Sequence, residues 1–249
     1  MISGTRVIDA HGHVGNWEVL GMRDDAGEVL RTMDRAGIDV AVVFGIFHPE
    51  GRRSNDAAAA FAAAHPDRFA ALAYASPLVP EGMVPELRRA IDDLGFLGVK
   101  IYPPYTPWPL DHEAWDPIYA FVEERGLPLL SHTDAGDVSR PAQLAAAARR
   151  FPGASFIAGH SGNTEPARSE AIRAAQELPN YYLETCSTYR TPGVIEELVA
   201  GAGADRVLFG SDQPLMDPRP QLGKILTADL TDEEKRLVLG GNAARLLRL

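Results

Sequence analysis

The sequence predicts a single-domain α/β protein, a (β/α)8 TIM barrel spanning residues 1–249. Apolar runs typical of strands alternate with helix-patterned segments along the chain, and the strand starts recur about every thirty residues, the length of one strand-helix unit. No low-complexity block or shift in composition suggests a second domain. With 249 residues, 45% of them hydrophobic, the chain is long enough to bury one sizeable core.

Eight short runs are predicted to be strands because they are apolar and bounded by turn residues. In chain order they are Arg6–Asp9, Val40–Phe44, Phe69–Tyr74, Gly98–Tyr102, Pro128–Ser131, Ser155–Ala158, Tyr181–Glu184 and Val207–Gly210. If they pair in this order, the carboxyl ends of all of them meet at one mouth of the barrel.

Helices are predicted between these runs, where apolar residues recur at intervals of three and four. The segments are Asp24–Ala36, Asn55–Ala64, Val84–Leu94, His112–Arg125, Ala142–Arg150, Glu165–Glu177 and Gly193–Ala200. Turn sequences such as "AGID", "ERGLP" and "FPGAS" separate each helix from the next strand. After the last strand, Thr231 with Glu234 predicts a capped helix, followed by a short terminal helix after Gly240–Gly241.

Charge and composition narrow the class of partner. The net charge is −10, and such an acidic surface should repel the phosphates of nucleic acids. The longest apolar run, around Ala57 to Ala64, is too short to cross a membrane. Cys186 is the single cysteine, so no intrachain disulfide can form, and no secretory segment is evident at the N-terminus. We therefore expect a cytoplasmic protein that binds a small molecule, with assembly into a homo-oligomer left open.

Histidines follow several of the predicted strands. In "VIDAHGHVG", His11 and His13 are two residues apart, so on a strand their rings would lie on one face. His132 in "LLSHTD", His160 in "IAGHSG" and Asp212 in "LFGSDQP" come at the ends of the fifth, sixth and eighth predicted strands. Imidazoles and carboxylates are the ligands that zinc and similar divalent ions take. Their convergence at one mouth predicts a metal site.

Five short motifs carry a family resemblance. "DAHGHVG", "GVKIYP", "SHTD", "GHSG" and "GSDQP" occur in this order over nearly the whole chain, which resembles the amidohydrolase-related branch of the amidohydrolase superfamily. That branch contains metal-dependent hydrolases and decarboxylases. The resemblance implies His11, His13, His132 and Asp212 as metal ligands. It also implies that His160 either binds the metal weakly or stands beside the bound water.

The number of metal ions depends on Lys100 of "GVKIYP". In two-metal members of the superfamily a lysine of this strand is carbamylated and bridges the ions. We expect instead one divalent ion per chain, Zn²⁺, with Lys100 orienting substrate or pairing with a carboxylate. A buried lysine held by an ion pair is an equal alternative.

Candidate substrate contacts come from the strand ends and the loops that follow them. They are Trp17, His48, Lys100, Tyr102, Glu184 and Arg190. Aromatic loops suit a flat or apolar substrate, and a guanidinium can bind a carboxylate through two parallel hydrogen bonds. His48 could equally pack its loop. Glu184 could support a metal ligand from behind or meet substrate, with simple burial at the edge of the core as an equal alternative.

The sequence thus favours a metal-dependent hydrolase acting on a small organic substrate, aromatic or carboxylate-bearing. The ion would lower the pKa of a bound water from about 16 toward 7. Asp212 would bind the ion and accept the proton of the water, while His160 would stabilise the developing oxyanion. A non-oxidative decarboxylase of the same family is the nearest alternative. A barrel that binds a metabolite without catalysis is the third.

Overall fold

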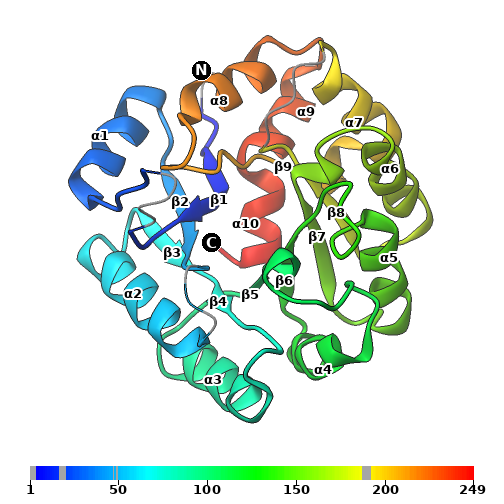
Figure 1. The fold of residues 1–249 in the computed structure, drawn as a ribbon. Coiled ribbons are helices and arrows are strands. Elements are labelled where there is room, and N and C mark those ends of the chain that lie inside the picture. Colours follow the sequence, from blue (N-terminus) through cyan, green and yellow to red (C-terminus); the bar gives the residue numbers. More distant parts are fainter. Residues whose placement is uncertain (1–3, 17–20, 47, 49, 187–191) are drawn as a thin grey trace.

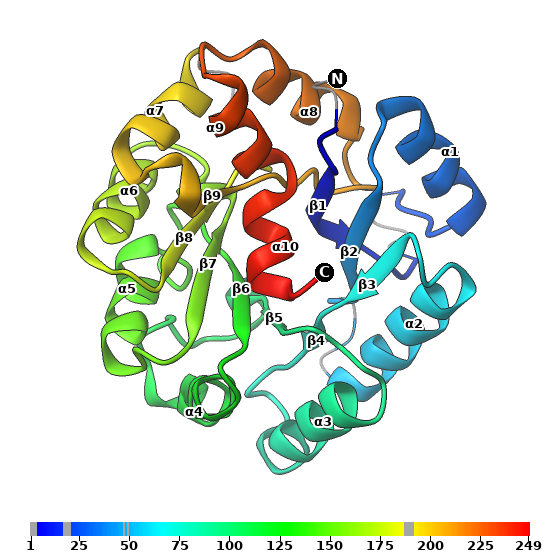
Figure 2. The same cartoon turned by 180° about the vertical axis from the view of Figure 1, so that it is seen from behind.

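The computed structural model describes residues 4–16, 21–46, 48, 50–186 and 192–249. A closed ring of parallel strands lies at the centre, and helices surround it (Figure 1). Seen from behind, the C-terminal helix α10, Asn242–Leu247, lies across the opening at the other end of the ring (Figure 2). The predicted (β/α)8 barrel is confirmed. No helix within the described residues has the length and apolar character needed to cross a membrane.

The strands follow one another around the ring in chain order, and all paired neighbours are parallel, although β3 and β4 do not pair with each other. They are β1 Ile8–His13, β2 Val40–Phe44, β3 Phe69–Ala71, β4 Ala73–Tyr74, β5 Val99–Ile101, β6 Pro128–His132, β7 Ser155–Gly159, β8 Tyr181–Glu184 and β9 Val207–Leu208. The predicted strand Phe69–Tyr74 is divided at Leu72, because β3 pairs with β2 whereas β4 pairs with β5.

The barrel closes between β1 and the extended residues that follow β9. The backbone N–H of Ala10 donates to the carbonyl of Phe209 at 2.9 Å, and that of Asp212 donates to the carbonyl of His11 at 2.8 Å. The N–H of His13 then donates to the carbonyl of Gln213 at 2.6 Å. This seam brings the two ends of the strand order together.

The helices cover the outside of the ring. They are α1 Ala26–Ala36, α2 Gly51–Ala64, α3 Pro80–Asp92, α4 Asp116–Arg125, α5 Pro141–Arg150, α6 Ala167–Glu177, α7 Val194–Ala202, α8 Pro218–Thr227, α9 Asp232–Arg236 and α10. Helices α2 and α3 begin four residues before the predicted starts at Asn55 and Val84, and α3 uses Pro80 as its first residue. Helix α8 is absent from the sequence prediction.

The C-terminal segment is one continuous helical stretch rather than two separate helices. The predicted cap of α9 is confirmed, since Thr231 and Glu234 exchange side-chain to backbone hydrogen bonds. A π-helical turn, Leu237–Gly241, then joins α9 to α10. Gly240 does not break the helix. A side chain there would collide with the carbonyl of Arg6, so glycine permits close packing on the strand that leads into β1.

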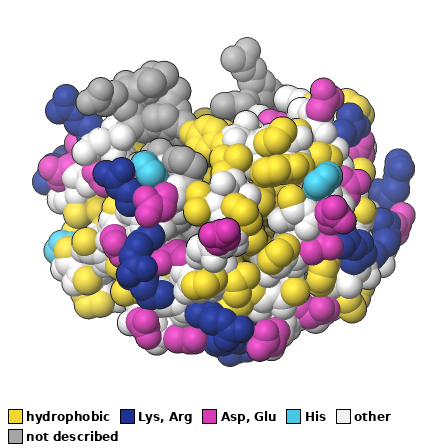
Figure 3. All heavy atoms as spheres, turned by 60° about the horizontal axis from the view of Figure 1, so that its bottom comes forward, with side chains coloured by type: hydrophobic (Ala, Val, Ile, Leu, Met, Phe, Trp, Pro, Cys, Tyr) yellow, Lys and Arg dark blue, Asp and Glu magenta, His cyan; other side chains and the backbone are white. Residues whose placement is uncertain are grey.

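Two apolar layers surround the strands. An interior cluster inside the barrel includes Ile8, Ala10, Phe44 and Leu130, and a larger cluster lies between the strands and the helices. Neighbouring helices of the outer ring are also joined by ion pairs at 2.7 Å, from Arg89 to Asp56 and from Arg125 to Asp92. Acidic and basic side chains are correspondingly intermixed on the face shown in Figure 3.

Candidate metal centre

A bulge in β1 directs both of its histidines into the barrel. Asp9 pairs with Ala41, whereas Gly12 pairs with Val43, so β1 contains one residue more than β2 over this stretch. Without this extra residue, the side chains of His11 and His13 would lie on the same face of β1 as that of Asp9, because residues two apart in a strand face the same way. Both rings instead contact the interior residue Phe44, with centroids 5.1 and 4.9 Å away.

His11, His13 and Asp212 form a compact donor group. The Nε2 atom of His13 lies 2.7 Å from Oδ1 of Asp212, and Nε2 of His11 lies 3.6 Å from the same oxygen. The three donor atoms lie within 4.8 Å of one another. Two imidazole nitrogens and one carboxylate oxygen are a donor set that suits a divalent ion. The residues present therefore fit the metal site predicted from the sequence.

Glu184 fixes the orientation of His11. Its Oε2 atom lies 2.9 Å from Nδ1 of His11 and accepts a hydrogen bond from the backbone N–H of His160 at 3.1 Å. When a carboxylate accepts the Nδ1 proton of a histidine, the opposite nitrogen keeps its lone pair for a metal. Of the three possibilities that the sequence left open for Glu184, this geometry favours support of a metal ligand. Glu184 is fully buried.

Burial and the neighbouring charges set the protonation of this group. Burial, together with the nearby Lys100, holds the pKa of His11 well below its usual value, so the ring is neutral. Burial opposes ionisation of Asp212, but the hydrogen bond from His13 and the nearby histidines outweigh it and lower the pKa of Asp212 well below the usual value. A neutral imidazole and an ionised carboxylate are the forms that bind metals.

His160 and His132 lie beside the donor group. The ring of His160 is 4.9 Å from that of His11 and 4.7 Å from that of His132. The Nδ1 atom of His160 lies 2.9 Å from the carbonyl oxygen of Cys186. The Nε2 atom of His132 lies 3.0 Å from Oδ2 of Asp134, away from the donor group. Its role as a fourth ligand stays a prediction.

Lys100 and Tyr102 line the same region from the end of β5. The Nζ atom of Lys100 lies 3.3 Å from Nε2 of His11 and 4.5 Å from the centroid of the Phe44 ring. Lys100 is only 1% exposed, and burial lowers its pKa to about 8. Tyr102 is half-buried, and its ring lies 4.9 Å from that of His132, so it forms an aromatic wall beside the histidines.

Three further candidates for substrate contact and the single cysteine complete the comparison with the sequence predictions. His48 accepts a hydrogen bond from the N–H of Glu50 at 3.1 Å and contacts Arg53, which favours loop packing over substrate contact. Trp17 and Arg190 lie outside the described residues. Cys186 is buried, and its Sγ lies 3.0 Å from Oε2 of Glu184. Burial and this carboxylate raise the pKa of the thiol well above its usual value.

Sequence reasoning missed Asp9, which is fully buried one residue before the bulge. Its carboxylate accepts hydrogen bonds from the backbone N–H of His11 at 3.1 Å and of Ser211 at 2.9 Å, and from the side chain of Gln213 at 2.6 Å. Burial raises the pKa of Asp9 to about 7, and the hydrogen bonds from the hydroxyl of Ser211 and from the backbone N–H groups of His11 and Ser211 act in the opposite direction. Ser211 and Gln213 lie 202 and 204 residues away from Asp9 in the sequence. The only local signal of this contact is therefore a polar residue inside an apolar run.

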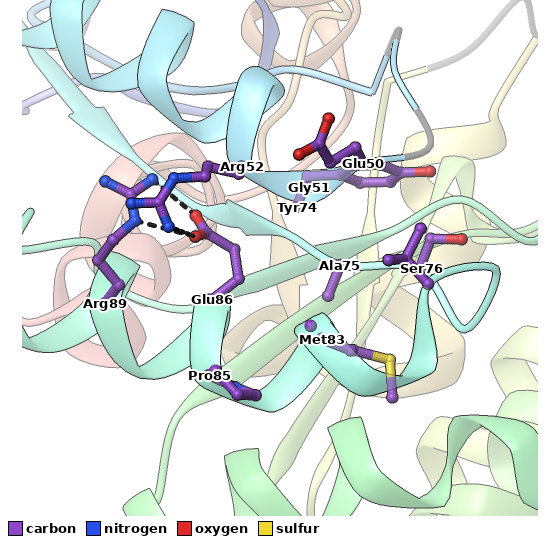
Figure 4. Close-up of a pocket in the computed structure, with 12 residues that line it drawn as sticks. Glu50, Gly51, Arg52, Tyr74, Ala75, Ser76, Met83, Pro85, Glu86 and Arg89 are labelled. Atoms are coloured by element: carbon purple, nitrogen blue, oxygen red, sulfur yellow. Dashed lines mark hydrogen bonds and ion pairs between the residues drawn. The ribbon is translucent and has the colours of Figure 1, made fainter.

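A separate cavity of about 340 Å³ lies between α2 and α3 (Figure 4). Arg52 and Arg89 extend into it from these helices, and both approach the carboxylate of Glu86, at 3.5 and 2.8 Å. Arg89 is also paired with Asp56 at 2.7 Å. None of the described residues that line this cavity is a predicted metal ligand.

Comparison with known proteins places this geometry in context. A family model described as Amidohydrolase matches residues 8–249. The gamma-resorcylate decarboxylase of Rhizobium sp. (strain MTP-10005) is 25% identical, with 98% of this chain and 86% of that protein covered. The predicted motif order thus agrees with an established family model over nearly the whole chain.

Two solved structures share the fold. The 5-carboxyvanillate decarboxylase of Sphingomonas paucimobilis superposes with a TM-score of 0.80 at 20% identity, covering 99% of this chain and all of that one. A dihydroxybenzoic acid decarboxylase of Polaromonas sp. JS666, solved with manganese and the inhibitor 2-nitroresorcinol, gives a TM-score of 0.80 at 18% identity. That superposition covers 98% of this chain and 97% of the other.

Proposed function

Because the chain belongs to the amidohydrolase family, we propose that it is a metal-dependent, non-oxidative decarboxylase of an aromatic carboxylic acid. The observation that carries this proposal is the group formed by His11, His13 and Asp212 at the mouth of the barrel. A full-length relative that decarboxylates gamma-resorcylate supports the choice of reaction. The sequence analysis favoured hydrolysis, but that reaction has support only at the level of the superfamily. Decarboxylation, the nearest alternative, is therefore preferred here.

The ion would be held by His11, His13 and Asp212, with His132 as the predicted fourth ligand. A divalent ion supplies positive charge that binds and polarises substrate oxygen atoms. The manganese of the similar Polaromonas structure supports a divalent ion, while zinc remains our prediction for this chain.

Aromatic side chains lie beside the donor group, and they favour an aromatic acid as the substrate. Tyr102 lies against both Tyr105 and His132, with ring centroids 4.6 and 4.9 Å away, so a flat ring could stack at this side of the mouth. Lys100 is too deeply buried to meet a bulky substrate and would act through its charge. Arg190 remains a predicted partner for the substrate carboxylate.

In the reaction, the bond between the ring carbon and the carboxylate breaks, its electron pair stays on the ring carbon, and carbon dioxide leaves. A proton must then be added to that carbon. We assign this transfer to Asp212, whose ionised carboxylate would first take a proton from solvent and then pass it to the ring carbon; its side chain is 15% exposed while those of His11 and Glu184 are 1% and 0% exposed. His160 would position the substrate beside Asp212.

The direct test is product analysis. The purified protein, loaded with Mn²⁺ or Zn²⁺, is incubated separately with 2,6-dihydroxybenzoate, 5-carboxyvanillate and a panel of aromatic esters and lactones. Carbon dioxide is trapped, and aromatic products are separated by chromatography. Release of carbon dioxide with formation of the decarboxylated phenol supports the proposal. Ester or lactone cleavage without carbon dioxide would establish the hydrolase, and tight binding without turnover would establish a binding barrel.

A further inference from the structure

A buried carboxylate spans the seam where the barrel closes. Asp9 is 0% exposed and lies on β1, whereas three of its four hydrogen-bond donors lie beyond β9. Its Oδ1 atom accepts from the N–H groups of His11 and Ser211. Its Oδ2 atom accepts from the hydroxyl of Ser211 and from Nε2 of Gln213. Each oxygen thus accepts two hydrogen bonds.

Asp212 lies between the two residues that Asp9 holds. Its backbone has a φ of 68°, a left-handed conformation that few residues with a side chain adopt. Such conformations persist where the surrounding contacts over-determine them. Ser211 and Gln213 provide those contacts on either side, through Asp9.

We infer that Asp9 is a positioning residue that holds the carboxylate of Asp212 beside the nitrogens of His11 and His13. The inference rests on the metal centre proposed above. Asp9 contacts the backbone of one ligand, His11, and both neighbours of another, Asp212. Through these contacts Asp9 fixes the relative positions of His11 and Asp212, two proposed ligands that come from opposite ends of the chain.

A purely structural role, in which Asp9 only holds the seam between β1 and the residues after β9, leads to a different expectation. Backbone hydrogen bonds, such as that from Ala10 to Phe209, already join β1 to the residues after β9. Asn242 on α10 provides a matched buried clamp at the start of β9, where its Nδ2 donates to the carbonyls of Ala204 and Val207 at 2.7 and 2.8 Å. Asn242 contacts none of the proposed ligands in the described hydrogen bonds, so its loss should affect stability alone.

The experiment compares metal affinity with thermal stability. Metal-free wild type, Asp9→Asn, Ser211→Ala and Asn242→Ala are titrated with Mn²⁺, and free Mn²⁺ is measured by electron paramagnetic resonance. Melting is followed by circular dichroism. Ser211→Ala removes one hydroxyl and tests the inference even if Asp9→Asn fails to fold. We expect both Asp9→Asn and Ser211→Ala to weaken Mn²⁺ binding about 10- to 100-fold, the range for residues that orient metal ligands.

Asn242→Ala should melt at a lower temperature but bind Mn²⁺ as the wild type does. Wild-type affinity in Asp9→Asn and Ser211→Ala would overturn the inference while leaving the metal centre intact. Equal weakening in Asn242→Ala would also overturn it, because general loosening of the barrel would then explain the loss. Failure of the wild type itself to bind Mn²⁺ would instead overturn the metal centre, and the inference with it.

Discussion

The Nε2 atom of His13 lies 2.7 Å from Oδ1 of Asp212, although 199 residues separate them in the sequence. The contact exists because the extended residues that follow β9 return to pair with β1. His13 and Asp212 hold each other with a hydrogen bond that an ion could replace by binding both atoms.

Asp212 and His11 should fail in different ways. In Asp212→Asn, the amide keeps an oxygen that can face the ion, but it cannot carry the proton. Turnover should therefore fall about 10²- to 10⁴-fold, while the metal is largely retained. His11→Asn should lose metal first and activity as a result. Titrating Zn²⁺ or Mn²⁺ into both variants during turnover should rescue His11→Asn only. Equal rescue would make Asp212 merely a ligand and would shift proton transfer to His160.

Glu184 should control metal affinity through His11. In the wild type, the carboxylate of Glu184 faces Nδ1 of His11 and the backbone N–H groups of His160 and Cys186. The amide in Glu184→Gln has only one acceptor oxygen, so some of these donors lose their acceptor. We expect metal affinity to fall about 10- to 100-fold in chelator competition. The matched control is Glu86→Gln, a buried carboxylate paired with Arg89 away from the site. Loss of affinity in both variants would contradict the specific role of Glu184.

Gly210 leaves room for the packing behind the metal centre. A Cβ atom there would collide with Oε1 of Glu184 and lie 2.8 Å from Cβ of His11. Gly210→Ala should therefore lower the free energy of unfolding by about 1 to 3 kcal/mol, the usual cost of overpacking. Gly223→Ala on α8 is the control, because nothing lies within 4 Å of its Cβ position. Urea denaturation of both variants tests this, and similar stabilities would refute the close packing.

Metal content should be one divalent ion per chain, held by the group of His11, His13 and Asp212. Lys100 lies 3.3 Å from Nε2 of His11, and we expect no bridging role for it, so Lys100→Met should keep the same stoichiometry. Elemental analysis of protein purified without added metal gives the number directly. Two ions in the wild type and fewer in Lys100→Met would show that Lys100 is a bridging carbamate.

Much of this fold could be predicted because local patterns specify it. Each predicted strand overlaps an observed one, and the capping of α9 by Thr231 was predicted from four residues. Helix α8 was missed because Pro218 and Pro220 obscure its start, although proline is well tolerated in a first turn.

The site was harder to predict in its details. The spacing of His11 and His13 correctly indicated that their rings lie together, with centroids 5.3 Å apart. The bulge that turns both rings inward depends on register with β2, which the sequence of β1 alone does not reveal. The roles of Asp9 and Glu184 depend on contacts across the closed barrel, which no local pattern contains.

The position of the ion is the most direct test of the account. Crystals grown with Mn²⁺ and measured with anomalous scattering at the manganese edge should show one peak, bonded to Nε2 of His11, Nε2 of His13 and a carboxylate oxygen of Asp212. A second donor group, His11, His160 and Cys186, lies on the other side of the same histidine. A peak in that group, or none near His13 and Asp212, would contradict the metal centre proposed here.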